Sequence, residues 1–424
     1  MRIAAVALLA FACATSEPRD PGAEETDDPT TEDSDDPTLD PTSDTSTAGD
    51  DDDDDTDLPT TLPMPQGWNE VDDAPGRVVS ASMDLAFGSD GVVYASWVED
   101  RDGEEDIYVS TSADGGVSWA PSVKVDDEST DPLVGTGRQP YLTVTDTGVF
   151  LTFTTDAPSV ELWQSPLGSL SFTRQPISLA NDIVFVDYAK AAEAPDGSVW
   201  VAWHSYDASG GFFESARTSN GLAVEAAVAY QGEPCECCRT DVRFNEAGVG
   251  MLAFRNNVAN VRNQWVLTAQ PGDATFTSAV EASSTDWNSN ICPMQGPRLN
   301  ELADSTQLIT WADASSGQWM VYLAQSWDGG QSWTADTQIL AAEGGDQRSP
   351  TIAVDADDTI WLTAELPTGY ALATSVDGGA NFSIDERLNI DPTNIYEAFA
   401  AADHGMAAVA GVSAQGRALM RRLR

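Results

Sequence analysis

The chain has 424 residues, of which 69 are Asp or Glu and 20 are Lys or Arg, so its formal net charge is −49. A chain this acidic repels the phosphates of nucleic acid, which excludes nucleic acid as a partner. Only two of its residues are histidines and five are cysteines, so any site built from these residue types is confined to a few positions.

The N-terminus has the pattern of an export signal. Arg2 precedes an apolar run over residues 3–12, which is too short to span a membrane. Cys13 follows at once, as in bacterial lipoprotein signals, so residues 1–13 predict a signal peptide with a lipidated Cys13. Cleavage after Ala12 or Ala14, leaving a freely secreted protein, is the alternative. Either outcome places the protein at the bacterial cell envelope, as an outer-membrane lipoprotein, or outside the cell.

Residues 14–65 consist almost entirely of Asp, Glu, Thr, Ser and Pro, and include six consecutive aspartates at 50–55. Such a segment cannot bury enough apolar surface to offset the entropy of ordering it, and its like charges extend it. We therefore predict a disordered acidic tether that holds the remaining chain away from a membrane.

From residue 66 onward, a turn followed by an apolar strand recurs at intervals of roughly fifty residues, as in propeller blades. The apolar strands of seven such units are predicted at residues 93–97, 149–153, 199–203, 250–254, 307–311, 360–364 and 407–411. No stretch shows sustained helical periodicity. Residues 66–424 therefore predict an all-β domain, a β-propeller of four-stranded blades.

The two ends of this domain complement each other. Residues 398–424 supply only three strands, whereas residues 67–73 resemble the fourth-strand stretch at 118–127. An N-terminal strand that completes the last blade would close the ring and hide edges that otherwise template aggregation. We predict seven blades closed in this way, with a six-bladed ring as the alternative.

A short motif, Ser-x-Asp-x-Gly-x-x-aromatic, occurs three times. Its Ser and Asp side chains suit hydrogen bonding to the backbone of a tight turn, its Gly suits positive φ, and its aromatic ring returns the chain to the core. The copies are Ser112, Asp114, Gly116 and Trp119; Ser326, Asp328, Gly330 and Trp333; and Ser375, Asp377, Gly379 and Phe382. The motif resembles the Asp-box, or BNR repeat, of sialidase-like β-propellers, where its role is structural.

That resemblance does not extend to the catalytic residues of sialidases. The family uses three arginines to hold the substrate carboxylate, a Tyr–Glu pair, and an Asp as acid. Arg77, Arg298 and Arg348 are candidates for the arginines, but the only adjacent Tyr–Glu pair is Tyr396-Glu397. Neighbours along a strand point to opposite faces, so this pair would not act together.

Basic residues nevertheless gather where the loops of one propeller face are expected. Lys190 and five arginines mark the starts of first strands, and three more arginines lie in the loops between second and third strands. The funnel-rim residues predicted to bind a ligand are Arg77, Arg138, Arg298, Arg348, Arg255 and His204, with Arg101, Arg239 and Arg262 nearby. Guanidinium forks suit carboxylates, which indicates an acidic sugar or another anion. Alternatively, each arginine pairs with an Asp and binds the blades together.

Cysteines form the second constellation: Cys235, Cys237 and Cys238, with Cys292 later in the chain. The pattern resembles a group of exported bacterial sialidase-like propellers with a Cys-x-Cys-Cys motif. Outside the cytosol, two disulfides are the simplest outcome, with Cys292 bonded to one member of the cluster. Because local pairing within the motif is geometrically awkward, a zinc or cuprous copper site is the rival; no other cofactor is predicted.

These features favour an exported, lipid-anchored binding module that holds a glycan or protein ligand in its funnel without catalysis. Its only membrane contact would be the lipid anchor. A sialidase-like exo-glycosidase acting on an acidic sugar is one alternative, and an envelope scaffold protein is another.

Overall fold

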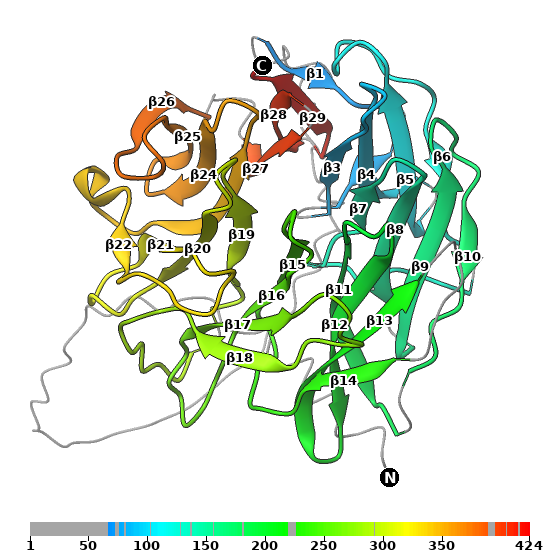
Figure 1. The fold of residues 1–424 in the computed structure, drawn as a ribbon. Coiled ribbons are helices and arrows are strands. Elements are labelled where there is room, and N and C mark those ends of the chain that lie inside the picture. The colour runs from blue at the N-terminus through cyan, green and yellow to red at the C-terminus, as the bar shows by residue number, and fades with distance from the viewer. Residues whose placement is uncertain are drawn as a thin grey trace, which may run out of the picture.

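The computed structural model describes residues 67–424, except for 73–75, 80–81, 102, 128, 136–137, 156, 180–181, 219–225, 292, 389–394, 404 and 414–415. Seven β-sheets stand around a central channel like the blades of a propeller (Figure 1). The prediction of an all-β propeller with seven blades is confirmed, and the six-bladed alternative is wrong. No helix among the described residues has the length and apolar character needed to cross a membrane.

Each blade is an antiparallel meander that runs from an inner strand at the channel to an outer strand. The first six blades, in chain order, are β3 (Asp84–Phe87), β4 (Val93–Asp100), β5 (Glu105–Ser112) and β6 (Val123–Lys124); β7 (Tyr141–Val144), β8 (Gly148–Thr155), β9 (Ser159–Pro166) and β10 (Thr173–Gln175); β11 (Phe185–Glu193), β12 (Val199–Asp207), β13 (Gly210–Thr218) and β14 (Ala227–Tyr230); β15 (Asp241–Phe244), β16 (Gly250–Arg255), β17 (Gln264–Ala269) and β18 (Ser278–Glu281); β19 (Arg298–Glu301), β20 (Gln307–Asp313), β21 (Met320–Ser326) and β22 (Thr337–Gln338); and β23 (Arg348–Val354), β24 (Ile360–Leu366), β25 (Gly369–Ser375) and β26 (Ser383–Arg387). A short strand, β2 (Arg77–Val78), extends the first sheet along β4, and one 3-10 turn, η1 (Ala341–Glu343), interrupts the described strands.

The last blade joins both ends of the propeller. Its strands are β27 (Ile395–Asp403), β28 (Met406–Ser413), β29 (Ala418–Arg422) and β1 (Asn69–Glu70). The N-terminal strand β1 pairs antiparallel with β29, with Asn69 opposite Met420 and Glu70 opposite Leu419. The ring is therefore closed by hydrogen bonds between its first and last strands, as the sequence predicted.

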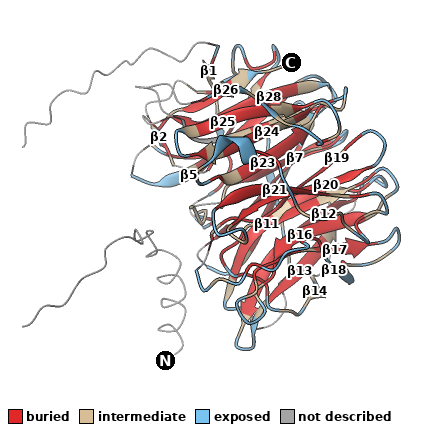
Figure 2. Cartoon of the chain, turned by 90° about the vertical axis from the view of Figure 1, so that its left-hand side faces the viewer, coloured by how far each residue is buried: buried red, intermediate tan, exposed pale blue. Residues whose placement is uncertain are grey.

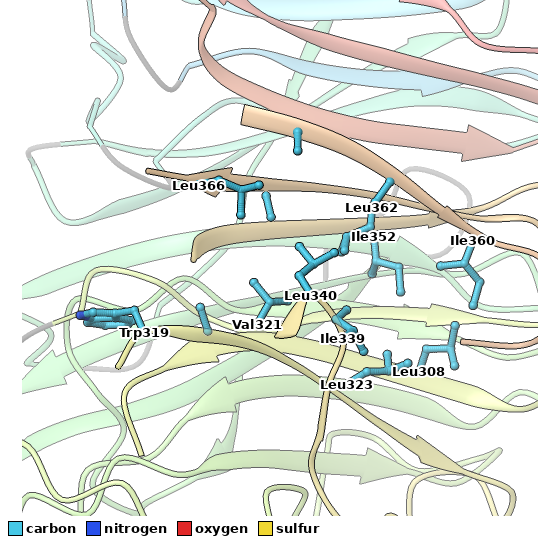
Figure 3. Close-up of a cluster of buried hydrophobic side chains, with 14 of the residues drawn as sticks. Leu308, Trp319, Val321, Leu323, Ile339, Leu340, Ile352, Ile360, Leu362 and Leu366 are labelled. Carbon is cyan, nitrogen blue, oxygen red and sulfur yellow. The ribbon is translucent and has the colours of Figure 1, made fainter. Parts of the chain in front are cut away.

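Apolar side chains fill the spaces between neighbouring blades. The second strand of every blade is buried along almost its whole length, because both of its faces pack against other blades (Figure 2). Between the fifth and sixth blades, Leu308 and Leu323 meet Ile352, Ile360 and Leu362 in one continuous cluster (Figure 3). Such strands read as apolar runs in the sequence, which explains why the seven second strands were visible there.

The three Ser-x-Asp-x-Gly hairpins share one hydrogen-bond pattern. In the first, the Ser112 hydroxyl donates to Asp114 at 2.8 Å and accepts from the Gly116 backbone N–H at 2.8 Å. The Asp114 carboxylate accepts from the backbone N–H and the hydroxyl of Ser118, and these bonds lower the pKa of Asp114 to about 2. The same bonds recur at Ser326, Asp328 and Gly330 and at Ser375, Asp377 and Gly379.

The second glycine of each hairpin also touches the preceding blade. A Cβ on Gly116 would lie 2.6 Å from Met420 Sδ of the last blade, and one on Gly379 would lie 2.7 Å from Leu323 of the fifth. Both glycines have positive φ, at 88° and 89°. The hairpins therefore fasten adjacent blades, which agrees with a structural role for the motif.

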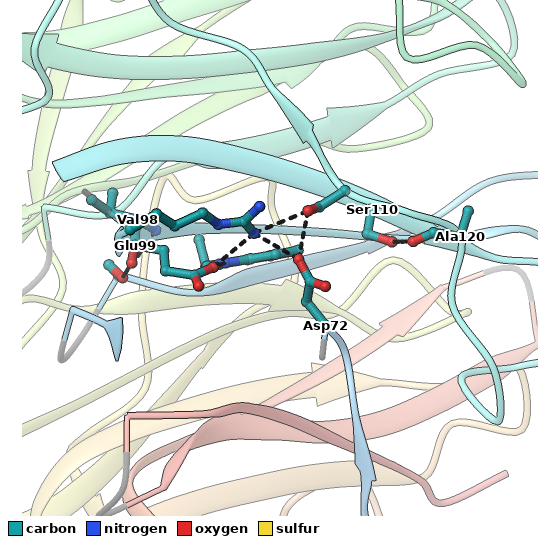
Figure 4. A network of polar contacts seen from close by, with 9 residues as sticks. Asp72, Val98, Glu99, Ser110 and Ala120 are labelled. Carbon is teal, nitrogen blue, oxygen red and sulfur yellow. Dashed lines mark hydrogen bonds and ion pairs between the residues drawn. The ribbon is translucent and has the colours of Figure 1, made fainter. Parts of the chain in front are cut away.

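A polar network adds to the closure of the ring (Figure 4). Arg101, after β4, donates to Asp72 at 2.7 Å and to Glu99 at 2.9 Å, and its guanidinium lies over the Tyr108 ring. Asp72 follows β1, so this ion pair ties the closing segment of the last blade to the first blade. All these side chains are at least partly buried.

Candidate functional site

The central channel is a candidate site with a volume of about 530 Å³. It is lined by residues of the inner strands of all seven blades. Side chains alternate along a strand, so the channel receives one set while Leu85, Leu142, Val242 and Leu299 turn into the core. The channel-facing set includes Asp84, Tyr141, Asp241 and Arg298, each the first residue of its strand, and Lys190 within β11.

These five side chains, which we call the channel cluster, come from five consecutive blades. Lys190 forms an ion pair with Asp241, and Arg298 hydrogen bonds to the Tyr141 hydroxyl. Each carboxylate also accepts a backbone N–H from the following blade: Asp84 from Leu142 at 2.9 Å and Asp241 from Leu299 at 2.8 Å. The cluster therefore links the blades as well as lining the channel.

The two carboxylates differ in their charge. Burial raises the pKa of Asp84 to about 6, despite the opposing effects of Lys190 and Arg298. Burial acts in the same direction on Asp241, but Lys190 and Arg298 outweigh it and lower the pKa of that carboxyl. Asp84 forms no ion pair with a described residue, whereas Asp241 does. The cluster thus holds two cations, one fixed anion and one carboxyl that titrates near neutral pH.

Most of the arginines predicted at the funnel rim bind other parts of the propeller. Arg138 holds the buried Asp187 of the third blade with two hydrogen bonds of 2.8 and 2.7 Å from different nitrogens. Arg348 pairs with Asp346 and lies over the Trp319 ring. Arg77 is exposed and has no ion-pair partner among the described residues. Of the three arginines considered as a sialidase-like triad, only Arg298 lines the channel.

Arg255 and His204 lie inside the domain rather than at the rim. Arg255 is 1% exposed and donates to the backbone carbonyls of Gln295, Arg262 and Ala312, so it links the fourth and fifth blades. His204 is fully buried and stacks on Phe213 at 4.1 Å between ring centroids. Burial lowers the pKa of His204 to about 3, so its ring is neutral at physiological pH. Neither side chain is placed to contact a ligand in the funnel.

The cysteine cluster lies in the loop that joins β14 to β15. Cys235 and Cys238 are free and buried, whereas Cys237 is disulfide-bonded to a residue outside the described ones. Cys13 and Cys292 also lie outside them, so the lipidation of Cys13 and the pairing of Cys292 stay predictions. A sulfur in a disulfide has no thiolate to give to a metal ion, which leaves two thiols for the predicted zinc or copper site. That metal site stays a prediction.

Two further sequence predictions concern residues that lie partly or wholly outside the described ones. The side chains of Tyr396 and Glu397 in β27 are not described, and neither are residues 1–66, which include the predicted signal peptide and the acidic tether.

Sequence reasoning missed three of the five channel residues: Asp84, Tyr141 and Asp241. All three begin an inner strand, as does Arg298. Superimposing the first strands of the repeats would have shown a polar residue at this position in four units. The prediction from the sequence instead emphasised arginines expected in loops, most of which already contact other parts of the protein.

The sequence matches no family model and no curated protein. Solved structures share the fold at very low sequence identity. Polysaccharide lyase Uly1 has a TM-score of 0.54 at 6% identity, covering 81% of this chain and 89% of its own. An ulvan lyase of polysaccharide lyase family PL25 has a TM-score of 0.52 at 10% identity, covering 82% and 94%. NanB sialidase from Streptococcus pneumoniae, in a K499G mutant form, scores 0.45 at 11% identity, covering 86% and 71%. The similarities to the two lyases show the propeller fold alone.

Proposed function

We propose that this protein is an exported, lipid-anchored glycan-binding module whose channel binds the carboxylate of an acidic sugar without catalysis. The observation that carries the proposal is the channel cluster, where Lys190, Arg298 and Tyr141 face a cavity of about 530 Å³. That volume falls within the range of small-ligand sites. The proposal places the ligand in the channel rather than on the rim.

The chemistry of the cluster supports an anionic ligand. A guanidinium presents paired N–H donors that match the two oxygens of a carboxylate, and a nearby ammonium adds charge. Lys190 and Arg298 together outnumber the permanently ionised carboxylate, Asp241. Within the channel cluster, protonation of Asp84 below about pH 6 leaves one positive charge in excess, so an anion is expected to bind more tightly at low pH. Asp146, Glu193 and Asp403 also line the channel, so the excess is confined to the cluster.

Several arginines outside the channel are already paired, which indicates that they stabilise the fold and do not bind a ligand. Arg101, Arg138 and Arg348 each have a carboxylate partner, as the scaffold alternative requires. Arg101 and Arg138 join neighbouring blades, whereas Arg348 pairs within its own loop, and this leaves the channel as the place for recognition. A protein ligand would require exposed contacts beyond the channel, and no described feature favours one.

A second candidate function rests on Asp84. A carboxyl with a pKa of about 6 and no ion-pair partner among the described residues has the properties of a general acid or base. Tyr141 and Arg298 lie in the same channel, so a bound acidic sugar would meet a proton carrier, a hydroxyl and a cation. Two of the three structures named above are polysaccharide lyases. The alternative is therefore an enzyme that cleaves an acidic polysaccharide.

Calorimetric titration of the full chain with a uronic-acid oligosaccharide and a neutral oligosaccharide of equal length tests the proposal. We expect the acidic sugar alone to bind, and Arg298→Gln to weaken binding at least tenfold. Arg348→Gln, which removes a cation outside the channel, is the matched control and should leave binding unchanged. Equal binding of both sugars, or equal loss in both variants, would contradict a carboxylate site in the channel.

The same samples separate binding from catalysis. New reducing ends in the acidic oligosaccharide, lost in Asp84→Asn, would establish the enzyme alternative instead. Mass spectrometry of the protein purified from bacterial membranes addresses the anchor, since an acylated N-terminal Cys13 is the expected species.

A further inference from the structure

A pair of thiols lies in the loop that precedes the fourth blade. Cys235 and Cys238 are three residues apart, both 0% exposed, and their sulfur atoms are hydrogen-bonded at 2.9 Å. The loop is held in place by backbone bonds from Cys235 N–H to the Arg255 carbonyl at 2.9 Å and from Cys238 N–H to the Cys235 carbonyl at 3.3 Å. The fold therefore brings two reduced sulfurs together at the spacing of a Cys-x-x-Cys motif.

Two buried arginines flank this pair. Arg262 donates from Nη1 to Cys235 Sγ at 3.1 Å and from Nε to the Ser289 carbonyl at 2.8 Å. Arg255 donates to backbone carbonyls. Neither arginine forms an ion pair with a described carboxylate, although both are less than 10% exposed. A buried guanidinium without an anion is costly, so the sulfur of Cys235 is the natural site of the compensating negative charge.

The third sulfur of the cluster does not compete for this role. Cys237 Sγ lies within 4.8 Å of the other two, but Cys237 is already disulfide-bonded. Met294 packs against the cluster and adds to its apolar cover. The only reduced sulfurs at this place in the described structure are therefore those of Cys235 and Cys238.

We propose that Cys235 and Cys238 form a redox-active dithiol that exchanges with the disulfide of another molecule, with Cys235 as nucleophile and Cys238 as resolving thiol. The contacts of the two sulfurs agree with these roles. Cys235 Sγ accepts a hydrogen bond from the Arg262 guanidinium, whereas no described cation donates to Cys238 Sγ. A neighbouring guanidinium favours the thiolate, so Cys235 is the sulfur placed to act as nucleophile.

The exchange balances without any further oxidant. The Cys235 thiolate attacks one sulfur of an external disulfide R–S–S–R, forming Cys235–S–S–R and releasing one RS⁻. Cys238 then loses its proton and attacks Cys235 Sγ, which breaks the mixed disulfide and releases the second RS⁻. The dithiol is oxidised by two electrons to a Cys235–Cys238 disulfide, and the external disulfide is reduced to two thiols. Both sulfurs are buried and Glu236 between them is exposed, so the exchange requires this loop to open.

Oxidised glutathione is the probe for this exchange, with the full chain alkylated afterwards and digested for peptide mass analysis. In the unaltered protein we expect a Cys235–Cys238 disulfide and no retained glutathione. Cys238→Ser should trap a glutathione adduct on Cys235, whereas Cys235→Ser should carry none on Cys238. The proposal is overturned if Cys238→Ser stays unmodified, or if the adduct forms equally on Cys238 in Cys235→Ser.

A third variant separates reactivity from mere proximity. Arg262→Gln removes the donor to Cys235 and should slow adduct formation on a Cys238→Ser background about tenfold at pH 7, because less thiolate is present. Its rate should recover at higher pH, which a purely structural defect would not produce. Arg217→Gln, at an exposed ion pair in the third blade, is the control that should keep the original pH profile. An unchanged profile in Arg262→Gln would contradict the role assigned to that guanidinium.

Discussion

The closure of the ring and the channel cluster both consist of charged side chains, but they use them differently. At the closure, Arg101 contacts two carboxylates and an aromatic ring, and Asp72 also accepts from the Ser122 hydroxyl. In the channel, Asp84 accepts backbone N–H groups from Leu142 of the next blade and from Leu85, and has no ion-pair partner among the described residues. Charges that only hold the fold together are fully compensated, whereas a charge that is left incompletely compensated is available to a ligand or a proton.

The largest effect is expected at the closure. Arg101→Met removes a partly buried cation and leaves Asp72 and Glu99 close to each other without a counter-charge. Loss of one partner of such a pair costs about 3 kcal/mol. We expect the urea midpoint of unfolding to fall accordingly. Arg217→Met, which breaks the exposed pair with Asp196, is the control, and its cost should stay below about 1 kcal/mol. If both variants lost a similar free energy of unfolding, the ion pairs at the closure would stabilise the fold no more than an exposed pair does.

A smaller effect is expected where the first hairpin touches the last blade. Gly116→Ala places a methyl group 2.6 Å from Met420 Sδ at a φ of 88°. The strained backbone and the displaced side chain together should cost about 2 kcal/mol. Gly91→Ala is the matched control, because Gly91 has a φ of 79° but no atom within 4 Å of the added carbon. The unfolding temperature of Gly91→Ala should fall by about half as much as that of Gly116→Ala, because only the backbone strain remains.

Repeating patterns made the fold predictable from the sequence, but the site depended on pairings that the sequence does not display. The seven second strands are buried on both faces and therefore read as apolar runs, and the Ser-x-Asp-x-Gly hairpins hydrogen bond within a few residues. By contrast, Arg138 meets Asp187 across 49 residues, and Asp84 meets Leu142 across 58. Such contacts depend on how one blade is positioned against the next. The sequence therefore showed where basic residues recur along the chain, but not which of them already pair with a carboxylate.

The cysteines show the same limit at closer range. The Cys-x-Cys-Cys pattern indicated unusual sulfur chemistry, but not that Cys235 and Cys238 would be the free pair. Arg262 reaches Cys235 from 27 residues away, and its role follows only from that contact. The local spacing of the cysteines thus identified the motif, but not the Arg262 guanidinium that contacts Cys235 from the next blade.

The smallest expected effect distinguishes the channel from the closure by its pH dependence. Asp84 has a pKa of about 6 in the folded chain, against an ordinary value of 3.8. Between these two values the folded chain binds more protons than the unfolded one, so Asp84 lowers the stability of the protein as the pH rises from about 4 to above 6. Asp84→Asn removes this ionisation and keeps an acceptor for the Leu142 N–H. At pH 8 it should therefore increase the free energy of unfolding by about 2 kcal/mol or less and raise the unfolding temperature accordingly. At pH 4 it should have little effect on either quantity.

Asp114 is the matched control for Asp84, because its pKa is lowered whereas that of Asp84 is raised. Hydrogen bonds from Ser118 lower the pKa of Asp114 to about 2, so that carboxylate stabilises the fold above pH 4, and the contribution is lost as the pH falls through 2. Asp114→Asn should accordingly lower the unfolding temperature at pH 8, whereas Asp84→Asn raises it. If both variants lowered it at pH 8, Asp84 would be a structural carboxylate like Asp114. Asp84 would then not titrate near neutral pH, and the pH dependence proposed for anion binding could not come from that carboxyl.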